Sequence, residues 1–279
     1  MPGIAPKHAV PIAPESRATV HRPEPKPVIV LGPDRSPEVD QSPGGMSRVF
    51  RLDQDMIVTI DGPAASGKTA TAEALAKVLG LHVLSTGAMY RCATAIAIEH
   101  GIAKQHVFRL LEVVRKAHIH FDWHETRSPE IIAFGKNYSH RISDEDVTAR
   151  VSEMSEIIPL RELMVGMQRD IAKSHRRLVS EGRDQGSVVF PDAPVKFYLF
   201  ASARVRAERR RAQLLAKKGI DRDVKELEQE IAARDENDRK KAYGALVKPD
   251  DALEVDSSTQ TLDEVVTMMR NHVLERAKK

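Results

Sequence analysis

One segment constrains this chain more than any other, and it reads Gly62-Pro63-Ala64-Ala65-Ser66-Gly67-Lys68-Thr69. It fits the pattern G-x-x-x-x-G-K-[ST], in which the glycines let the backbone turn its N–H groups towards phosphate. A β-branched run over 57–60 precedes the segment, and a helical pattern that ends at Gly80 follows it. The start of such a helix adds unpaired N–H groups and the positive end of its dipole. This order predicts a phosphate-binding loop, with Lys68 reaching the β- and γ-phosphates and Thr69 offering a hydroxyl to Mg²⁺.

Composition excludes several other classes of protein. Of the 279 residues, 41% are hydrophobic and 30% are charged, which is typical of a globular domain. We find neither an apolar run of membrane-spanning length nor the apolar segment of a signal peptide, so we expect no membrane partner. Cys92 is the single cysteine, which excludes an internal disulfide and a cysteine-rich zinc site and favours a cytoplasmic location. A net charge of +3 and 4% aromatic residues argue against a nucleic-acid polymer as partner.

The chain divides into a tail and one α/β domain. Residues 1–45 hold ten of the 16 prolines and show no apolar periodicity, so we predict a disordered tail. Residues 56–279 alternate short apolar runs with helical patterns, which indicates a mostly parallel sheet covered on both faces. The expected strands cover 57–60, 81–84, 178–180, 195–199 and 253–255. The expected helices cover 88–99, 105–117, 147–174 with a break at Pro159, 203–217, 224–240 and 262–276. Alternating residues over 118–143 indicate a small β-rich insertion.

A second anion site is indicated by arginines and short polar residues that recur at expected helix starts and strand ends. They are Thr86 and Arg91, Ser155 and Arg161, Arg183 and Asp184, and then Arg234, Asp238 and Lys241. Two polyanions can react only when fixed cations offset their repulsion, and arginine grips phosphate at two points. The carboxylates Asp184 and Asp238 cannot face phosphate, and we expect them to read a base amino group or ribose hydroxyls. A guanine-reading N-K-x-D tetrapeptide does not occur in the sequence, which disfavours a Ras-like GTPase.

Several of these segments resemble bacterial cytidylate kinases, in the same order along residues 56–275. They are Thr59-Ile60-Asp61-Gly62-Pro63, Thr86-Gly87-Ala88-Met89-Tyr90-Arg91, Glu181-Gly182-Arg183-Asp184, Val188-Val189-Phe190-Pro191-Asp192-Ala193 and Arg234-Asp235 with Asp238. The resemblance implies a P-loop sheet with a nucleoside-monophosphate-binding region (about 86–170, containing the insertion) and a LID (about 206–243). It also implies a monomer that transfers phosphate from ATP, with Mg²⁺, to CMP or dCMP.

The resemblance also assigns roles to residues of this sequence. ATP is expected to lie on the loop from Gly62 to Thr69 and on Ala70. The residues that match CMP contacts are Thr86, Arg91, Ser155, Arg161, Arg183, Asp184, Arg234, Asp238 and Lys241. Lys68, Arg183 and Arg91 are expected to be catalytic. Ser85 and Lys241 depart from the family, which usually has Asp and often Arg there, and lysine lacks the two-point grip of arginine.

Some interpretations stay open from the sequence. Arg206, Arg209 and Arg210 either contact triphosphate or form a solvated helix face. Glu181 either lies near the Mg²⁺ shell or pairs with an arginine. Histidines 118, 120 and 124 are expected to be exposed turn residues, because no acidic or thiolate partner is evident for a metal site. Alternatives to a (d)CMP kinase are a P-loop kinase of UMP or a small metabolite, and a non-catalytic nucleotide-binding regulator.

Overall fold

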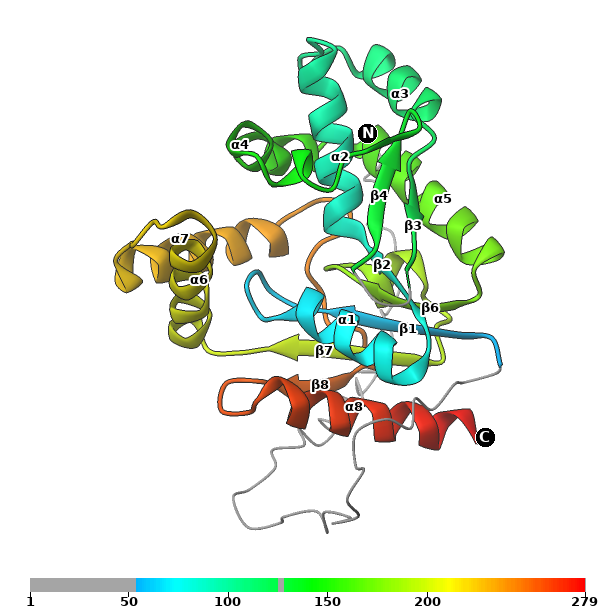
Figure 1. Ribbon diagram of the computed structural model, residues 1–279, viewed down its shortest axis with the longest axis vertical. Coiled ribbons are helices and arrows are strands. Elements are labelled where there is room, and N and C mark those ends of the chain that lie inside the picture. The colour runs from blue at the N-terminus through cyan, green and yellow to red at the C-terminus, as the bar shows by residue number, and fades with distance from the viewer. Residues whose placement is uncertain (1–53, 125–127, 279) are drawn as a thin grey trace, which may run out of the picture.

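A five-stranded parallel sheet forms the centre of the computed structural model, which describes residues 54–124 and 128–278 (Figure 1). The strand order is β2-β6-β1-β7-β8. The bounds are β1 Met56–Asp61, β2 His82–Ser85, β6 Arg177–Glu181, β7 Val195–Phe200 and β8 Leu253–Asp256. The expected parallel sheet is therefore confirmed, whereas the expected tail over residues 1–45 lies outside the described residues.

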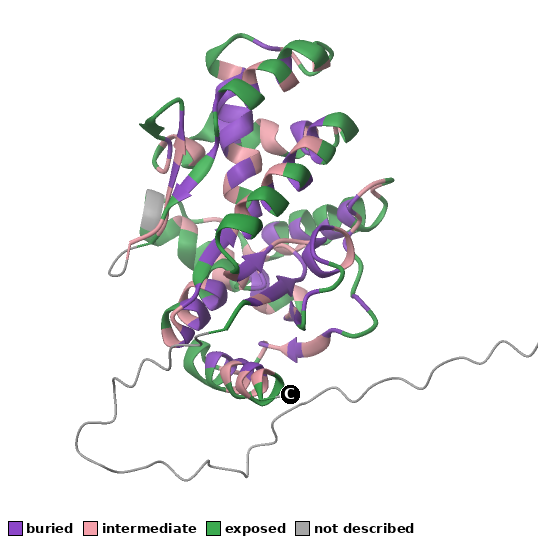
Figure 2. Cartoon of the chain, turned by 90° about the vertical axis from the view of Figure 1, so that its right-hand side faces the viewer, coloured by how far each residue is buried: buried purple, intermediate pink, exposed green. Residues whose placement is uncertain are grey.

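Helices cover both faces of this sheet, as expected. On one face, α1 (Lys68–Leu79) and α8 (Leu262–Ala277) bury an apolar cluster that includes Val58, Leu75 and Met269. On the other face, α2 (Thr86–Glu99) and α5 (Ile158–Ser174) contribute to a second cluster that includes Met89 and Leu178. Neighbouring residues of one strand point to opposite faces, so β6 contributes Leu178 to one cluster and Val179 to the other. The strands of the central sheet are mostly buried (Figure 2).

The strand register gathers polar residues at one edge of the sheet. Ser85 of β2 lies opposite Glu181 of β6, which lies opposite Ile60 of β1. The next residue of β1, Asp61, pairs with Tyr198 of β7. These carboxyl ends of parallel strands form the edge at which open α/β sheets bind ligands.

The segment between β2 and β6 rises from the sheet as a largely helical layer with a small sheet of its own. It contains α3 (Val107–Lys116), η1 (Arg141–Ser143), α4 (Glu145–Met154) and the antiparallel strands β3 (His120–Asp122), β4 (Glu130–Ala133) and β5 (Lys136–Asn137). The strands expected within 118–143 are thus confirmed. The indole Nε1 of Trp123 donates to the Val83 carbonyl at 2.7 Å, which attaches the small sheet beside the edge strand β2.

Two details of the helices differ from the sequence prediction. The helical stretch over 147–174 is interrupted at 155–157, and Pro159 lies in the first turn of α5, where a missing N–H costs little. The five residues of η2 (Gln185–Val189) form a π-helical turn that the sequence analysis did not predict.

A helical hairpin lies beside the phosphate-loop segment. It consists of α6 (Ala203–Lys218) and α7 (Val224–Arg239), which pack through Ala207, Leu227 and Ile231, with Ala65 of the loop against them. In Figure 1 this hairpin projects to the left of the sheet. Within residues 54–124 and 128–278, no helix is both long and apolar enough to cross a membrane.

Candidate active site

The predicted phosphate loop lies between β1 and α1, and its backbone explains the need for glycine. Gly62 has φ +152°, and a Cβ added there would lie 2.0 Å from the Leu199 carbonyl oxygen. Any side chain at this position would therefore force the loop away from β7. Lys68 begins α1, and its Nζ donates to the Pro63 carbonyl at 2.6 Å. Burial lowers the pKa of Lys68 to about 8, although the carboxylate of Glu181 acts in the opposite direction.

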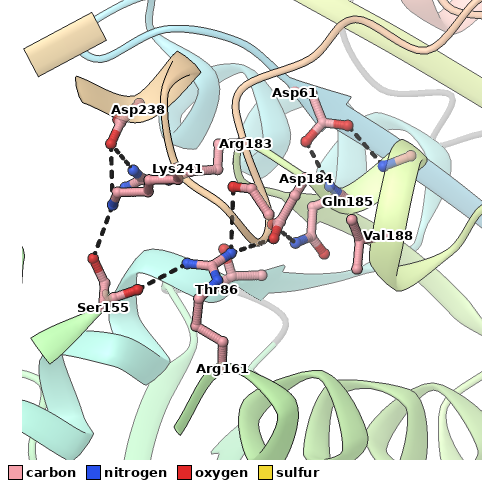
Figure 3. Close-up of polar contacts among 12 residues, drawn as sticks. Asp61, Thr86, Ser155, Arg161, Arg183, Asp184, Gln185, Val188, Asp238 and Lys241 are labelled. Carbon is pink, nitrogen blue, oxygen red and sulfur yellow. Dashed lines mark hydrogen bonds and ion pairs between the residues drawn. The ribbon is translucent and has the colours of Figure 1, made fainter. Parts of the chain in front are cut away.

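Asp61 fixes the turn at the end of β6 next to the loop. Its carboxylate oxygens accept from the backbone N–H groups of Gln185 and Gly186, both at 2.7 Å (Figure 3). Burial raises the pKa of Asp61 to about 7, even though these two hydrogen bonds favour the charged form. The contact positions Arg183 and Asp184, which directly precede the turn, beside the phosphate loop.

Glu181 forms an oxygen-rich corner with two hydroxyls. Its Oε1 accepts from Ser85 Oγ at 2.6 Å and from Thr69 Oγ1 at 3.2 Å. Of the two interpretations left open for Glu181, these bonds favour a place in the metal shell, because Mg²⁺ prefers oxygen ligands and usually keeps several waters. The donor set therefore fits Mg²⁺, and Ser85, one of the two departures from the family pattern, orients the carboxylate.

Cations converge between the phosphate loop and the second set of predicted residues. The pKa of Arg234 is lowered mainly by burial and further by the charge of Arg183. The pKa of Arg91 is also lowered mainly by burial and further by the charge of Arg234. Arg183 and Arg234 also lower the pKa of Lys68, and Arg183 lowers that of Lys241. These groups repel one another, so their arrangement favours an anion that can balance them.

The residues predicted to contact a base gather around one buried ion pair. Arg161 of α5 and Asp184 form this pair, and both are almost fully buried. Arg161 Nη1 donates to the Ser155 carbonyl at 3.1 Å, and Gln185 Nε2 donates to Asp184 at 3.2 Å (Figure 3). Thr86 lies nearby, with its hydroxyl donating to the Glu181 carbonyl at 3.0 Å.

A second ion-pair chain joins the end of α7 to the same region. Arg183 pairs with Asp238, and Lys241 Nζ lies 3.2 Å from the same Asp238 oxygen and 3.2 Å from Ser155 Oγ. Arg91 lies on the other side, where its Nη1 donates to Thr148 Oγ1 at 3.0 Å. The structure thus brings together the predicted residues from α2, the end of α4, α5, the β6–η2 turn and α7.

The three arginines of α6 that the sequence analysis treated together make different contacts. Arg206 is buried, and its Nη1 donates to Asp235 at 2.6 Å and to the Ala64 carbonyl at 2.9 Å. Arg209 donates to the Ser257 carbonyl at 2.5 Å. Of the two interpretations left open, the solvated helix face is excluded for the buried Arg206, whereas Arg209 is partly exposed and bonded to Ser257. Burial lowers the pKa values of Arg91 and Arg234, and the charge of Arg210 lowers them further.

One histidine of the insertion has acidic partners that the sequence analysis did not anticipate. His124 Nε2 lies 3.7 Å from Asp122 and 3.6 Å from Glu130, and one ligand atom from each of the three residues lies within 4.8 Å of the others. Asp122 and Glu130 face each other in the register of β3 and β4, which explains why residues distant in sequence meet. The other expectation about a reactive side chain is confirmed, since Cys92 is fully buried in the core.

Comparison with known proteins bears on the same residues. The family model for cytidylate kinase matches residues 58–276. A cytidylate kinase from Bacillus cereus is 40% identical over 215 residues, covering 77% of this chain and 94% of the relative. One from Streptococcus agalactiae is 40% identical over 213 residues, covering 76% and 93%. One from Oceanobacillus iheyensis is 37% identical over 224 residues, covering 80% and 96%. With these matches spanning the loop, the buried pair and the convergent arginines, the chain belongs to the cytidylate kinase family.

Proposed function

We propose that this chain is a (d)CMP kinase, which transfers the γ-phosphoryl group of ATP to CMP or dCMP and releases ADP with CDP or dCDP. The family membership supports this activity. The observation that carries it is the convergence of Lys68, Arg183, Arg234 and Arg91. Besides burial, the charges of Arg183 and Arg234 lower the pKa of Lys68, that of Arg183 lowers the pKa of Arg234, and that of Arg234 lowers the pKa of Arg91. Such repulsion is offset when two phosphate groups lie between these residues.

ATP binds, in this proposal, with its phosphates on the loop from Gly62 to Ala70. Lys68 then turns from the Pro63 carbonyl to the β- and γ-phosphates, since a phosphate oxygen is a stronger acceptor than a carbonyl. Thr69 and Glu181, whose oxygens lie together, would hold Mg²⁺. The bound ion would supply positive charge that neutralises the triphosphate.

The acceptor lies across the cation cluster. Its phosphate binds to four cations, Arg91, Arg183, Arg234 and Lys241. It replaces part of the ion pairing that Asp238 makes with Arg183 and Lys241. Its base faces Ser155, Arg161 and Asp184, where a donor and an acceptor lie side by side. Thr86 and Asp238 are the remaining contacts that we assign to the acceptor.

The reaction is an in-line transfer. An acceptor phosphate oxygen forms a bond to the γ-phosphorus while the bond from that phosphorus to the β-bridging oxygen breaks, and ADP leaves with the electron pair. A phosphate monoester is already anionic near neutral pH, so the site needs no general base. Lys68, Arg91 and Arg183 neutralise the charge of the transferring group, and closure of a LID over about residues 206–243 excludes water.

An acceptor panel tests this proposal. The full chain is incubated with labelled ATP and Mg²⁺ together with CMP, dCMP, UMP or small phosphorylated and hydroxylated metabolites, and the transferred label is measured. We expect transfer to CMP or dCMP, and Lys68→Ala should abolish it while the circular dichroism spectrum stays unchanged. Wild-type turnover in that variant contradicts the assignment. Transfer only to another acceptor supports the alternative kinase, and ATP binding without any transfer supports the regulator.

The setting of the enzyme also belongs to the proposal. A monomer in the cytoplasm, without a membrane or nucleic-acid partner, agrees with the near-neutral charge balance and with the single, buried cysteine. Burial raises the pKa of the Cys92 thiol to about 12, so the thiol is protonated and inert at neutral pH.

A further inference from the structure

We propose that Tyr243 is a positioning residue that holds the Arg161 guanidinium for recognition of the acceptor base. The inference rests on the proposed function and assigns a role to a residue that the motif comparison did not select. Tyr243 belongs to residues 241–246, here called the strap, which continue directly from the end of α7.

Two tyrosine rings flank the Arg161 side chain. The guanidinium carbon lies 5.4 Å from the centre of the Tyr90 ring and 5.8 Å from the centre of the Tyr243 ring. Arg161 is 2% exposed, so these cation–π contacts lie in a largely desolvated place, where they are strongest. Tyr90 belongs to α2, in the same layer as Arg161, whereas Tyr243 comes from the strap.

The strap reaches the buried pair through a glycine. Gly244 has φ +62°, and a Cβ added there would lie 1.9 Å from Arg161 Nη2 and 2.2 Å from Asp184 Oδ2. The missing side chain therefore lets the backbone press against Arg161 and Asp184. Leu246 N–H donates to the Asp238 carbonyl at 2.9 Å, which closes the strap back onto the end of α7. The position of Tyr243 is thus tied to the helical hairpin and to the predicted acceptor residues at once.

A pocket opens beside this arrangement. It has a volume of about 330 Å³, and its lining includes Arg161, Lys241 and Tyr243. The Arg161 Nε is buried and has no hydrogen-bond partner within the described part of the chain. Because Nε itself has no partner, the guanidinium depends for its orientation on its other contacts, which include the two tyrosine rings.

The chemistry of the pair explains why the orientation of Arg161 matters. Arginine can only donate and an ionised aspartate can only accept. Cytosine presents acceptors at O2 and N3 and a donor at the 4-amino group, whereas uracil presents a donor at N3 and an acceptor at O4. A guanidinium fixed in one plane next to Asp184 therefore favours cytosine, and a guanidinium free to rotate discriminates less.

Steady-state kinetics on the full chain test this inference. We expect Tyr243→Ala to raise the KM for CMP about tenfold, in proportion to a lost buried cation–π contact, and to leave the KM for ATP within about twofold. The ratio of kcat/KM for CMP to that for UMP should fall, because Arg161 loses its fixed plane. Tyr243→Phe keeps the ring and should restore both values. Val247→Ala, at a half-exposed position just after the strap, is the matched control and should change neither.

Three outcomes overturn the inference. They are an unchanged KM for CMP in Tyr243→Ala, an equal rise of both KM values, and an unchanged CMP/UMP ratio. If Tyr243→Ala fails to fold, Tyr243→Leu fills the space without a π-system and should show the same selective loss, with CMP affinity measured by calorimetry. Wild-type-like values in Tyr243→Leu also contradict the inference. If the wild-type chain phosphorylates no nucleoside monophosphate, the proposed function itself fails, whereas a failure limited to the Tyr243 variants leaves it standing.

Discussion

Single residues show how burial tunes the chemistry of this site. Lys68 is a lysine at the start of a helix, where the dipole and the loss of water both disfavour its charge. Burial lowers its pKa to about 8, which leaves it protonated at neutral pH but close to titration. Ser85 is uncharged, and its hydroxyl donates a hydrogen bond to Glu181. An aspartate at position 85 would instead place a second carboxylate there and repel Glu181.

The pKa of Lys68 leads to a prediction about ATP binding. Only the protonated amine attracts the triphosphate, so ATP affinity should be insensitive to this group below about pH 7 and should fall by up to about tenfold per unit above about pH 8. Calorimetric Kd values for ATP between about pH 6.5 and 9.5 measure this. Lys68→Arg stays charged over that range and is the control. An equally steep decline in Lys68→Arg would assign the titration to another group.

Secondary-structure elements are joined to one another by buried polar contacts as well as by apolar packing. The hairpin of α6 and α7 has a small apolar core, but Asp235 of α7 also accepts from the Ala64 N–H of the phosphate loop at 3.2 Å. Arg206 of α6 donates to that carboxylate and to the Ala64 carbonyl. This buried ion pair also bonds the backbone N–H and carbonyl of Ala64 in the loop, so it fixes the position of the hairpin relative to the loop.

This contact predicts a large effect on stability. Asp235→Ala should lower the free energy of unfolding by about 3–5 kcal/mol, because it leaves the Arg206 charge buried without its partner. The double variant Arg206→Met/Asp235→Leu should recover most of the loss, since it removes both charges. Urea denaturation of the wild-type chain, Asp235→Ala and the double variant measures these free energies of unfolding.

The same helical hairpin provides the control for this experiment. Arg211 and Asp221 form an ion pair that is exposed to solvent, so Asp221→Ala should leave the unfolding midpoint nearly unchanged. An equal loss in Asp221→Ala and Asp235→Ala would mean that burial does not set the strength of these pairs.

The described part of the molecule consists of a sheet with one apolar cluster on each face. Two further parts, the layer between β2 and β6 and the helical hairpin, adjoin the edge where the strands end. The family match covers residues 58–276, which includes both clusters, the layer between β2 and β6, and the hairpin. Residues 1–45 lie outside that match and outside the described residues. Every residue that we assign to the site lies within the described part of the chain.

We therefore predict that removal of residues 1–45 leaves catalysis unchanged. The shortened chain should have the kcat, the KM for CMP and the KM for ATP of the full chain within about twofold, because every residue assigned to substrate lies after position 61. Parallel kinetics and thermal unfolding of both chains provide the comparison. A selective rise in one KM would assign the tail a part in binding that substrate.

Features that depend on neighbouring residues were predictable from the sequence alone. The strand, loop and helix around Gly62 follow from local dihedral needs and apolar spacing, and the four other expected strands and six other expected helices follow from the same periodicities. The residues of the phosphate loop came from motif spacing, the acceptor residues came with the resemblance to cytidylate kinases, and the structure brings the two sets together. The break that Pro159 predicts in the helix over 147–174 is present but lies at 155–157, and the turn η2 was missed, because it depends on contacts made elsewhere in the fold.

The tertiary structure decided which partner each polar group takes. Arg206 and Arg210 share one helix and one residue type, yet only Arg206 meets a buried aspartate from α7. Tyr243 lies over Arg161 because the strap returns across the sheet edge, and Glu181 meets Ser85 because β2 and β6 are neighbours. Sequence spacing fixes what a residue can offer, whereas the order of the strands fixes what lies within hydrogen-bonding reach of it.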